Sequence, residues 1–313
     1  MRGWLLLFLL VAACQQVPHA VASSRAALTA PQPPTACPTP PAPARRTIAD
    51  HVIILSEDGL RPDALAQARA PMHEALMREG AYTLRARTIR FASTLPSHAS
   101  MLSGFDVGAH GLSWNSWQPS RGFIKVPTVF SVVGGAGEQT AAFVGKRKLE
   151  HILPPGSRTT FSNPGYLCRK VAPPAAAHFR DSRPRVEFVH FSDPDSSGHS
   201  VGWMSDDQIA SIGRSDECLA TLVEAIKQTD PARTLLIISA DHGGRGRNHS
   251  GAREEDRLIP WIAWGAGVRP GHHIDGPVST FDTAATALWA LGYPSPAGGT
   301  GHPVKEAFEE QVR

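Results

Sequence analysis

The sequence has little of what marks several classes of protein. It contains four cysteines among 313 residues and no Cys-x-x-Cys motif, which argues against a thiolate zinc site or a thioredoxin-like redox centre. Its 31 basic and 28 acidic residues leave a formal net charge of +3, too small to indicate a nucleic-acid or anionic-membrane partner. We find no nucleic-acid-binding module, no internal repeat and no second core.

The chain also lacks an apolar run long enough to form a permanent transmembrane helix. The run at Trp4–Val11 follows a basic start and is typical of a secretory signal. Cleavage after the small-x-small sequence ending at Ala22 would make residues 1–22 the signal peptide. Cleavage before Cys14, in a sequence that resembles a bacterial lipoprotein box, would make residues 1–13 the signal and attach a lipid. Both alternatives predict export to the periplasm or secretion, and the second adds a membrane anchor.

The rest of the chain divides into a linker and one large domain. Residues 23–46 are rich in Pro and Ala, and we expect them to form an extended linker without a core. Residues 47–313 are long enough for a single catalytic domain with a substantial core. Because Cys37 lies in the linker, Cys168 and Cys218 remain as candidates for a disulfide in an oxidising compartment.

Within that domain, short apolar runs alternate with helical patterns. The runs predict buried strands at 52–56, 141–144, 186–191, 235–238 and 259–265. The helical patterns predict helices at 71–79, from just after Thr94 to Gly104, and at 128–134, 207–228 and 281–291. Segment 154–184 is rich in turns and shows little periodicity. This alternation predicts the α/β class, with a doubly wound, mostly parallel sheet flanked by helices.

Three of the predicted strands are followed by side chains that bind metals. In an open α/β sheet, the carboxyl ends of the strands form the edge at which ligands bind, so these side chains should meet there. Carboxylates and imidazoles without thiolates suit zinc or a similar transition metal, and six such groups are enough for two ions. The candidates are Asp58, Asp195, His199, Asp241, His242 and His249.

Thr94 has two interpretations. Pro96 suits a first helical turn, so Thr94 should lie at a helix N-terminus, where free N–H groups favour anions. A threonine there can also serve only as a helix cap.

Two kinds of side chain near these positions bear on the substrate. Trp114, Trp117 and Trp203 could offer a flat wall to an aryl group or nucleobase, although most tryptophans pack in the core. The basic run 146–148 follows a predicted strand, so Lys146 could reach a phosphate, although such runs are usually solvated.

Four motifs together resemble the type I phosphodiesterase/nucleotide pyrophosphatase family of the alkaline phosphatase superfamily. The resemblance covers about Ile48 to Phe308. It implies an alkaline-phosphatase-like fold and a zinc hydrolase with two metal ions and a threonine nucleophile. The motifs are Asp58-Gly59-Leu60-Arg61-Pro62-Asp63, Thr94-Leu95-Pro96-Ser97-His98, Pro194-Asp195-Ser196-Ser197-Gly198-His199 and Asp241-His242-Gly243.

The same resemblance implies a role for each residue of these motifs. Thr94 would attack phosphorus and form a phosphothreonine, while Asn115 and the Leu95 N–H would hold the phosphate oxygens. One zinc would be held by Asp58, Asp241, His242 and Thr94, and the other by Asp195, His199 and His249.

The sequence departs from the family pattern at two places. Glu57 stands before the metal Asp, where an apolar residue is usual, and could perturb the site electrostatics. His249 follows His242 closely, without the long insertion of the eukaryotic members, as in compact bacterial members and the phosphomutase branch. The sulfatase branch is disfavoured because Thr94 stands where sulfatases carry a modified cysteine.

These observations predict an exported hydrolase of phosphate diesters or pyrophosphates that acts on a small phosphate ester. A phosphomonoesterase on the same scaffold and an inactive, metal-stabilised envelope binding protein are the alternatives. We expect diesters to be preferred, with Trp203 forming an apolar wall and Lys146 near the phosphate. The sequence leaves the natural substrate and oligomeric state open.

Overall fold

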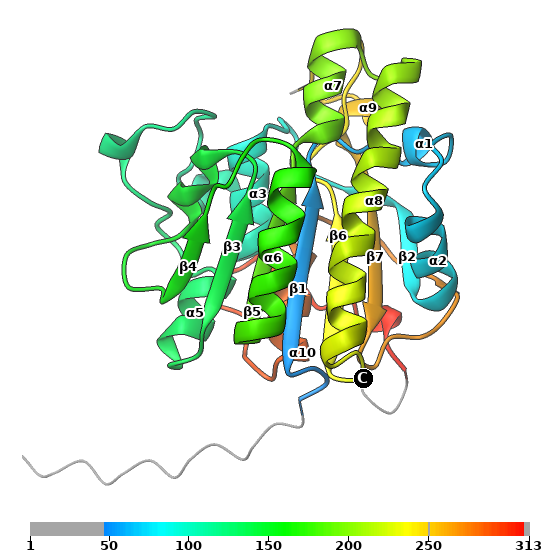
Figure 1. Ribbon diagram of the computed structural model, residues 1–313. Helices are drawn as coiled ribbons and strands as arrows, with labels where there is room; N and C mark the ends of the chain where they lie inside the picture. The colour runs from blue at the N-terminus through cyan, green and yellow to red at the C-terminus, as the bar shows by residue number, and fades with distance from the viewer. Residues whose placement is uncertain (1–46, 250, 310–313) are drawn as a thin grey trace, which may run out of the picture. The chain divides into compact units, whose positions relative to one another are not determined.

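A computed structural model describes residues 47–249 and 251–309 (Figure 1). The predicted signal, the linker and Cys14 lie outside the described residues. Among the described residues, no helix is long and apolar enough to cross a membrane.

An eight-stranded sheet forms the centre of this part of the chain, with strand order β4-β3-β5-β1-β6-β7-β2-β8. All neighbouring strands pair in parallel except that β7 runs antiparallel to both β6 and β2. The strands are β1 (His51–Glu57), β2 (Ala81–Arg87), β3 (Thr140–Val144), β4 (Thr159–Ser162), β5 (Val186–Phe191), β6 (Thr234–Ser239), β7 (Leu258–Gly265) and β8 (His272–His273).

Helices cover both faces of the sheet, as predicted for a doubly wound fold. In Figure 1, α6 and α8 lie in front of the sheet, and α3, α5 and α10 lie behind it. The helices are α1 (Pro62–Leu65), α2 (Pro71–Glu79), α3 (Thr94–Ser103), α4 (Val107–His110), α5 (Val129–Gly135), α6 (Cys168–Ser182), α7 (Asp193–Val201), α8 (Asp206–Thr229), α9 (Glu254–Arg257) and α10 (Asp282–Ala290).

The strand β1 divides the core into two layers because its side chains alternate between the faces. Val52 and Ile54 pack with the apolar cluster that includes residues of α3, α5 and α10. Ile53 and Leu55 pack with the cluster that includes residues of α2, α6 and α8. Because β5, β1 and β6 are parallel and in register, their carboxyl ends meet at one edge of the sheet.

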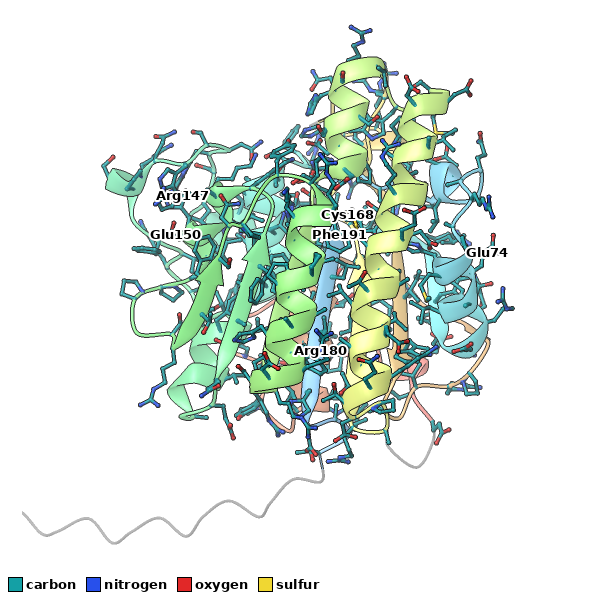
Figure 2. All side chains as sticks on the ribbon, viewed as in Figure 1. Glu74, Arg147, Glu150, Cys168, Arg180 and Phe191 are labelled. Atoms are coloured by element: carbon teal, nitrogen blue, oxygen red, sulfur yellow. A yellow bond between two sulfur atoms is a disulfide. The ribbon has the colours of Figure 1, made fainter. Side chains whose placement is uncertain are left out.

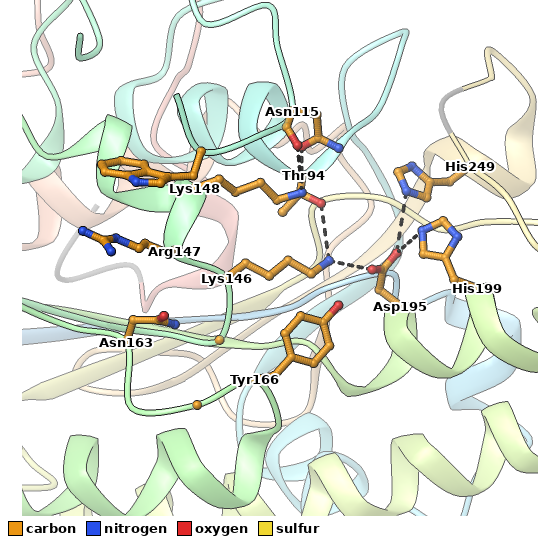
Figure 3. Close-up of a pocket in the computed structure, with 13 residues that line it drawn as sticks. Thr94, Asn115, Lys146, Arg147, Lys148, Asn163, Tyr166, Asp195, His199 and His249 are labelled. Carbon is orange, nitrogen blue, oxygen red and sulfur yellow. Dashed lines mark hydrogen bonds and ion pairs between the residues drawn. The ribbon is translucent and has the colours of Figure 1, made fainter. Parts of the chain in front are cut away.

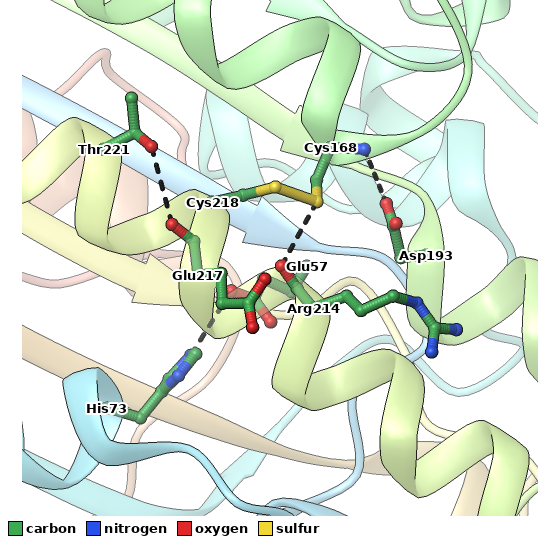
Figure 4. Close-up of a disulfide and its surroundings, with 8 residues drawn as sticks. All are labelled: Glu57, His73, Cys168, Asp193, Arg214, Glu217, Cys218 and Thr221. Carbon is green, nitrogen blue, oxygen red and sulfur yellow. Dashed lines mark hydrogen bonds and ion pairs between the residues drawn. A yellow bond between two sulfur atoms is a disulfide. The ribbon is translucent and has the colours of Figure 1, made fainter.

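A disulfide joins Cys168 at the start of α6 to Cys218 in α8 (Figure 4). The Cα atoms are 6.0 Å apart, and 50 positions separate the two cysteines in the chain. The pairing left open by the sequence is therefore present. By the chain-entropy estimate, closing a loop of this size stabilises the fold by about 4 kcal/mol.

The prediction for segment 154–184 was wrong, because it contains the 15-residue helix α6. Its prolines, Pro173 and Pro174, lie inside the helix and obscured the pattern. The buried positions do follow helical spacing, but alanines supply much of the stripe, and their small side chains give a weak periodic pattern. These positions are Cys168, Val171, Ala172, Ala175, Ala176 and Phe179.

Candidate active site

Three elements deliver the candidate ligands to the sheet edge. Asp58 directly follows β1, and Asp241 and His242 follow β6 after one residue. Asp195 and His199 lie one turn apart on α7, a helix that Pro194 favours in its first turn. The sequence analysis predicted no helix here, and this helix brings the last two side chains close enough to share an ion.

The first predicted ligand group is compact and fully buried. The Nε2 atom of His242 lies 3.4 Å from Oδ1 of Asp58 and 3.2 Å from Oδ2 of Asp241. Ligands about 2.0 Å from a tetrahedral zinc ion are roughly 3.3 Å from one another. These three side chains therefore have the spacing of a zinc site.

The second predicted group adjoins the first. Oδ1 of Asp195 lies 3.3 Å from Nε2 of His199 and 3.7 Å from Nε2 of His249. The His249 ring stacks on His242, with 3.7 Å between the ring centroids. His242 also lies close enough to Asp195 and His249 to share an ion with them, so the two groups meet at this imidazole.

The protonation of the three imidazoles suits metal binding. Each Nδ1 contacts a backbone carbonyl, which can only accept, so this nitrogen carries the proton. Each Nε2 of the neutral ring then presents its lone pair to the site, as in zinc-bound histidines. The contacts are His242 with Gly243 at 2.8 Å, His199 with Arg247 at 3.0 Å and His249 with Ala92 at 3.1 Å.

Buried polar atoms without a hydrogen-bond partner point to the same conclusion. Leaving such an atom unsatisfied costs about 1–3 kcal/mol, more if it is charged. Four of these atoms belong to the candidate ligands, so a cation would satisfy them, and the residues fit a metal. They are Asp58 Oδ1, Asp195 Oδ1, Asp241 Oδ2 and His242 Nε2.

The acidic groups of the site differ in their proton affinity. Burial by itself would raise the pKa of Asp58, but the Lys146 ammonium and the His190 hydrogen bond hold it well below its usual value. Burial, followed by repulsion from Asp58, raises the pKa of Asp241 well above its usual value. Asp241 is thus the carboxyl most prone to hold a proton, which a metal ion would have to displace.

The three ligand imidazoles also differ in pKa. Burial lowers the pKa of His242, and burial followed by the adjacent His242 lowers the pKa of His249 to about 4. Both rings are therefore neutral at physiological pH and free to bind a metal. The nearby Asp195 carboxylate raises the pKa of His199, so a proton competes with a metal ion for this ring.

Lys146 contacts a carboxylate of each group, and Figure 3 shows its contacts with Asp195 and Thr94. Its Nζ is 2.6 Å from Oδ2 of Asp58, 2.5 Å from Oδ2 of Asp195 and 3.5 Å from Oγ1 of Thr94. Burial works against the charge, but these carboxylates raise the pKa of Lys146 above its usual value. Of the basic run, only Arg147 resembles a solvated surface charge; it pairs with Glu150 (Figure 2).

Thr94 is buried and is the first residue of α3, with Ser93 in the capping position. Its hydroxyl therefore does not cap the helix, and it faces Lys146 and the cavity instead. Its carbonyl accepts a hydrogen bond from Nδ1 of His98, at 2.7 Å, which fixes the first turn of the helix.

Asn115 contacts the helix start differently from the expectation. Its Oδ1 accepts hydrogen bonds from the Leu95 N–H at 3.0 Å and from Nζ of Lys148 at 2.9 Å. The Leu95 N–H is thus occupied within the protein rather than facing a substrate. The amide nitrogen of Asn115 remains as the group that can donate to a ligand.

The predicted aromatic wall is also arranged differently. Trp203 is buried, packs against Gly198 and Gly244, and donates from Nε1 to the Gly59 carbonyl at 2.9 Å. A Cβ at Gly198 or Gly244 would lie within 2.5 Å of the indole ring. Trp203 therefore supports the ligand imidazoles from behind rather than lining the cavity.

The cavity itself has a volume of about 570 Å³. Figure 3 shows Asn115 beside Thr94, and the Tyr166 hydroxyl directed toward Lys146 and Asp195. Away from these residues the cavity is lined by side chains without carboxylates, namely Arg147, with Trp117 beneath its guanidinium, Lys148 and Asn163.

Sequence reasoning missed His190, which positions a predicted ligand. The Gly145 N–H donates to its Nδ1 at 3.3 Å, so Nε2 carries the proton and donates to Oδ2 of Asp58 at 2.9 Å. Its place near the end of a buried strand was a weak indication, because most such histidines are structural.

Glu57, the departure from the family pattern, points to the opposite face of the sheet. It is fully buried and lies 3.3 Å from Nε2 of His73, whose Nδ1 is 2.7 Å from Asp216 (Figure 4 shows Glu57 and His73). Burial opposes a charge on the ring, but Glu57 and Asp216 raise the pKa of His73 to about 9. The extra carboxylate is therefore balanced by a protonated histidine away from the metal ligands.

A family model described as type I phosphodiesterase/nucleotide pyrophosphatase matches residues 52–132 and 138–261. The chain belongs to this family. Its membership confirms the resemblance seen in the motifs.

Curated relatives of this phosphodiesterase-family chain are distant and longer. Ectonucleotide pyrophosphatase/phosphodiesterase family member 1 of Homo sapiens is 26% identical over 213 residues, 61% of this chain and 23% of the relative. Venom phosphodiesterase of Naja atra is 24% identical over 219 residues, 61% of this chain and 26% of the relative. The chain thus spans about a quarter of the length of these two proteins.

Solved structures show the same fold. Murine ectonucleotide pyrophosphatase/phosphodiesterase 5, as an inactive variant in complex with AMP, has a TM-score of 0.69 at 14% identity, covering 83% of this chain and 100% of that one. A 2-O GAG sulfatase has a TM-score of 0.67 at 16% identity, covering 82% of this chain and 73% of that one. These likenesses establish the predicted alkaline-phosphatase-like architecture.

Proposed function

We propose that this protein hydrolyses phosphate diesters or pyrophosphates, with two bound zinc ions and Thr94 as the nucleophile. One observation carries the proposal. The Thr94 hydroxyl opens into a cavity at the meeting point of two carboxylate–imidazole groups whose unpaired atoms have zinc-site spacing.

Each residue has a role in this proposal. Asp58, Asp241, His242 and Thr94 would hold one ion, and Asp195, His199 and His249 the other. Bound zinc lowers the pKa of a coordinated hydroxyl and stabilises developing charge on oxygen.

The chain's own groups carry the reaction. The Thr94 oxygen attacks phosphorus and its proton passes to solvent, while the bond to the leaving oxygen breaks and its electrons stay on that oxygen. The amide nitrogen of Asn115 donates to a non-bridging oxygen. Water then attacks the phosphothreonine at phosphorus, the bond between phosphorus and the Thr94 oxygen breaks, and a proton of that water restores the Thr94 hydroxyl as the phosphate product leaves.

We propose that diesters are preferred over monoesters. Trp117 and Tyr166 line the cavity and can pack against an ester group. Lys146 and Lys148 favour the opposite preference, because a monoester brings a second negative charge.

The experiment compares kcat/KM for an aryl phosphate and its methyl diester in wild type, Lys146→Ala and Lys148→Ala. A diester preference in the wild type supports the proposal. A monoester preference that collapses in either variant would replace it with phosphomonoesterase activity. The wild type is also assayed before and after metal removal, with zinc counted. Bound zinc without turnover of either ester would favour the metal-stabilised binding protein.

Export is part of the same proposal. It rests on the secretory pattern at Trp4–Val11 and on the Cys168–Cys218 disulfide, which is expected in an oxidising compartment. Fractionation of a Gram-negative bacterial host expressing the full chain tests it. The processed protein is expected in the periplasm, the medium or, if lipidated at Cys14, the membrane fraction, whereas unprocessed cytosolic protein would contradict export.

A further inference from the structure

Lys146 divides the oxygens of two carboxylates. In both Asp58 and Asp195, Oδ2 contacts the ammonium group, at 2.6 Å and 2.5 Å, while Oδ1 faces the ligand imidazoles. The two Oδ1 atoms have no hydrogen-bond partner. Lys146 therefore contacts the Oδ2 atoms and leaves the Oδ1 atoms available to a metal. Each ligand group supplies one of these two carboxylates.

The ammonium group has little access to solvent and cannot exchange these contacts for hydration. Lys146 is 9% exposed, and its three N–H bonds match three neighbours, namely the two carboxylates and Oγ1 of Thr94. A buried ammonium is stable only where anions compensate its lost hydration. The acidic cluster and the lysine thus depend on each other.

The charge of Lys146 affects the empty and the filled site in opposite ways. Asp58, Asp195 and Asp241 carry a formal charge of −3 when ionised, and the lysine reduces this to −2. With two divalent cations, the same groups reach +1 without the lysine and +2 with it. Like charges this close repel in a buried site, so the lysine stabilises the empty site much more than the filled one.

We propose that Lys146 is a placeholder cation for the metal centre. Before metal binds, it reduces the repulsion between the carboxylates. It also holds Asp58 and Asp195 with their Oδ1 atoms toward the imidazoles. It is a positioning residue, and the inference rests on only the metal-binding part of the proposed function.

Lys148 provides a matched control two residues further on. It carries the same side chain and lines the same cavity, but its Nζ contacts Asn115 rather than a candidate metal ligand. Substitution of Lys148 by methionine therefore removes one cation from the cavity without touching the acidic cluster.

The test compares Lys146→Met and Lys148→Met with the wild type, using the full chain freed of metal with a chelator. Thermal unfolding is recorded with and without zinc, and zinc affinity is measured by competition with a chromogenic chelator. For Lys146→Met we expect the zinc-free Tm to fall by about 5 °C or more and the zinc-loaded Tm to fall less. Zinc should bind this variant about tenfold more tightly, whereas Lys148→Met should bind it like the wild type.

Other results would overturn the proposal. Equal losses of Tm with and without zinc, or weaker zinc binding by Lys146→Met, would show that the lysine does not substitute for a metal ion. If this variant unfolds when zinc-free, its zinc affinity is measured instead by titrating the zinc-loaded form with chelator. Loss of zinc at a lower chelator concentration than in the wild type contradicts the proposal. A wild type that binds no zinc would instead refute the metal-binding part of the proposed function.

Discussion

Thr94 illustrates how a single residue gains its role from the helix that carries it. It is the first residue of α3 rather than its cap, so its hydroxyl is free of the helix backbone and faces the cavity. Among the described residues, the hydroxyl has one side-chain hydrogen-bond partner, Lys146, at 3.5 Å. The side chain therefore contributes little to folding, and its chemical role can be tested cleanly.

We expect Thr94→Ala to lose activity by about a thousandfold or more, as for loss of a nucleophile. Stability should change by no more than about 1 kcal/mol, because no cap is lost. Assays of turnover, zinc content and urea unfolding on the same preparation check this, with Thr94→Ser as the conservative control. A folded, zinc-loaded Thr94→Ala enzyme with near-normal turnover would exclude the phosphothreonine mechanism.

Asn115→Ala should be milder than loss of the nucleophile. Removing one donor to a developing oxyanion lowers kcat by about a hundredfold or more. Because Oδ1 of Asn115 also accepts from the Leu95 N–H, the start of α3 should loosen slightly as well. Steady-state kinetics show the effect, and Asn115→Asp, which keeps this acceptor but loses the donor, should be similarly slow. Normal kcat in Asn115→Asp would mean that the amide does not contact the reacting phosphate.

His249→Ala should remove one of two zinc ions and abolish turnover while the fold remains. The Asp58, Asp241 and His242 group does not include this ring, so it keeps its ion. Elemental analysis and circular dichroism provide the measurement. Full activity with one ion or none would refute the two-ion centre.

At the scale of elements, His73 links α2 to the strand that carries Asp58. Its ring lies between Glu57 of β1 and Asp216 of α8, and all three side chains are buried. A protonated ring between two carboxylates holds the three elements together. The packing of α2 and α8 on the sheet should therefore depend on pH.

The direction of this dependence follows from the raised pKa of His73. The group contributes its full stability below the unfolded pKa of about 6.5, and the contribution is lost as pH rises through the folded value of about 9. The full contribution is on the order of 3 kcal/mol. Urea unfolding of wild type and His73→Gln should differ most near pH 6 and converge above about pH 9.

Exposed His302 supplies the control, since His302→Gln should track the wild type at every pH. A wild-type advantage over His73→Gln that stays constant from pH 6 to 10 would mean that the ring is held neutral.

Elements with strong patterns were predictable from the sequence, and those shaped by tertiary contacts were not. The five buried strands and the helix at 71–79 have clear apolar runs or a proline start, and the structure contains them. Strand β2 reads Ala-Tyr-Thr-Leu-Arg-Ala-Arg, without a continuous apolar run, so its pairing with β7 could not be predicted from the local sequence.

Within the site, the ligand residue types were readable because strand ends deliver them. The supporting contacts of His190 and Lys146 depend on residues far away in sequence.

For the described part of the molecule, the Cys168–Cys218 bridge is the only disulfide. It joins two helices on one face of the sheet, and neither cysteine belongs to the candidate metal ligands. The double variant Cys168→Ser/Cys218→Ser should lose up to about 4 kcal/mol of unfolding free energy. Zinc content and kcat should stay near wild type at low temperature.

Reduction of the wild type with dithiothreitol should reproduce the same loss, and a reductant should have no effect on the double variant. Loss of zinc on reduction would contradict the prediction that zinc content does not depend on the disulfide.

The hydrogen bonds that orient the imidazoles have a consequence for how the site can diversify. His199 is held by the main-chain carbonyl of Arg247, whose side chain is exposed and takes no part in that bond. Any residue that keeps the local backbone can stand at this position without turning the ring. Position 247 can therefore accept mutations while the candidate metal ligands keep their orientation, which makes it a natural place to begin evolving new substrate preferences in the laboratory.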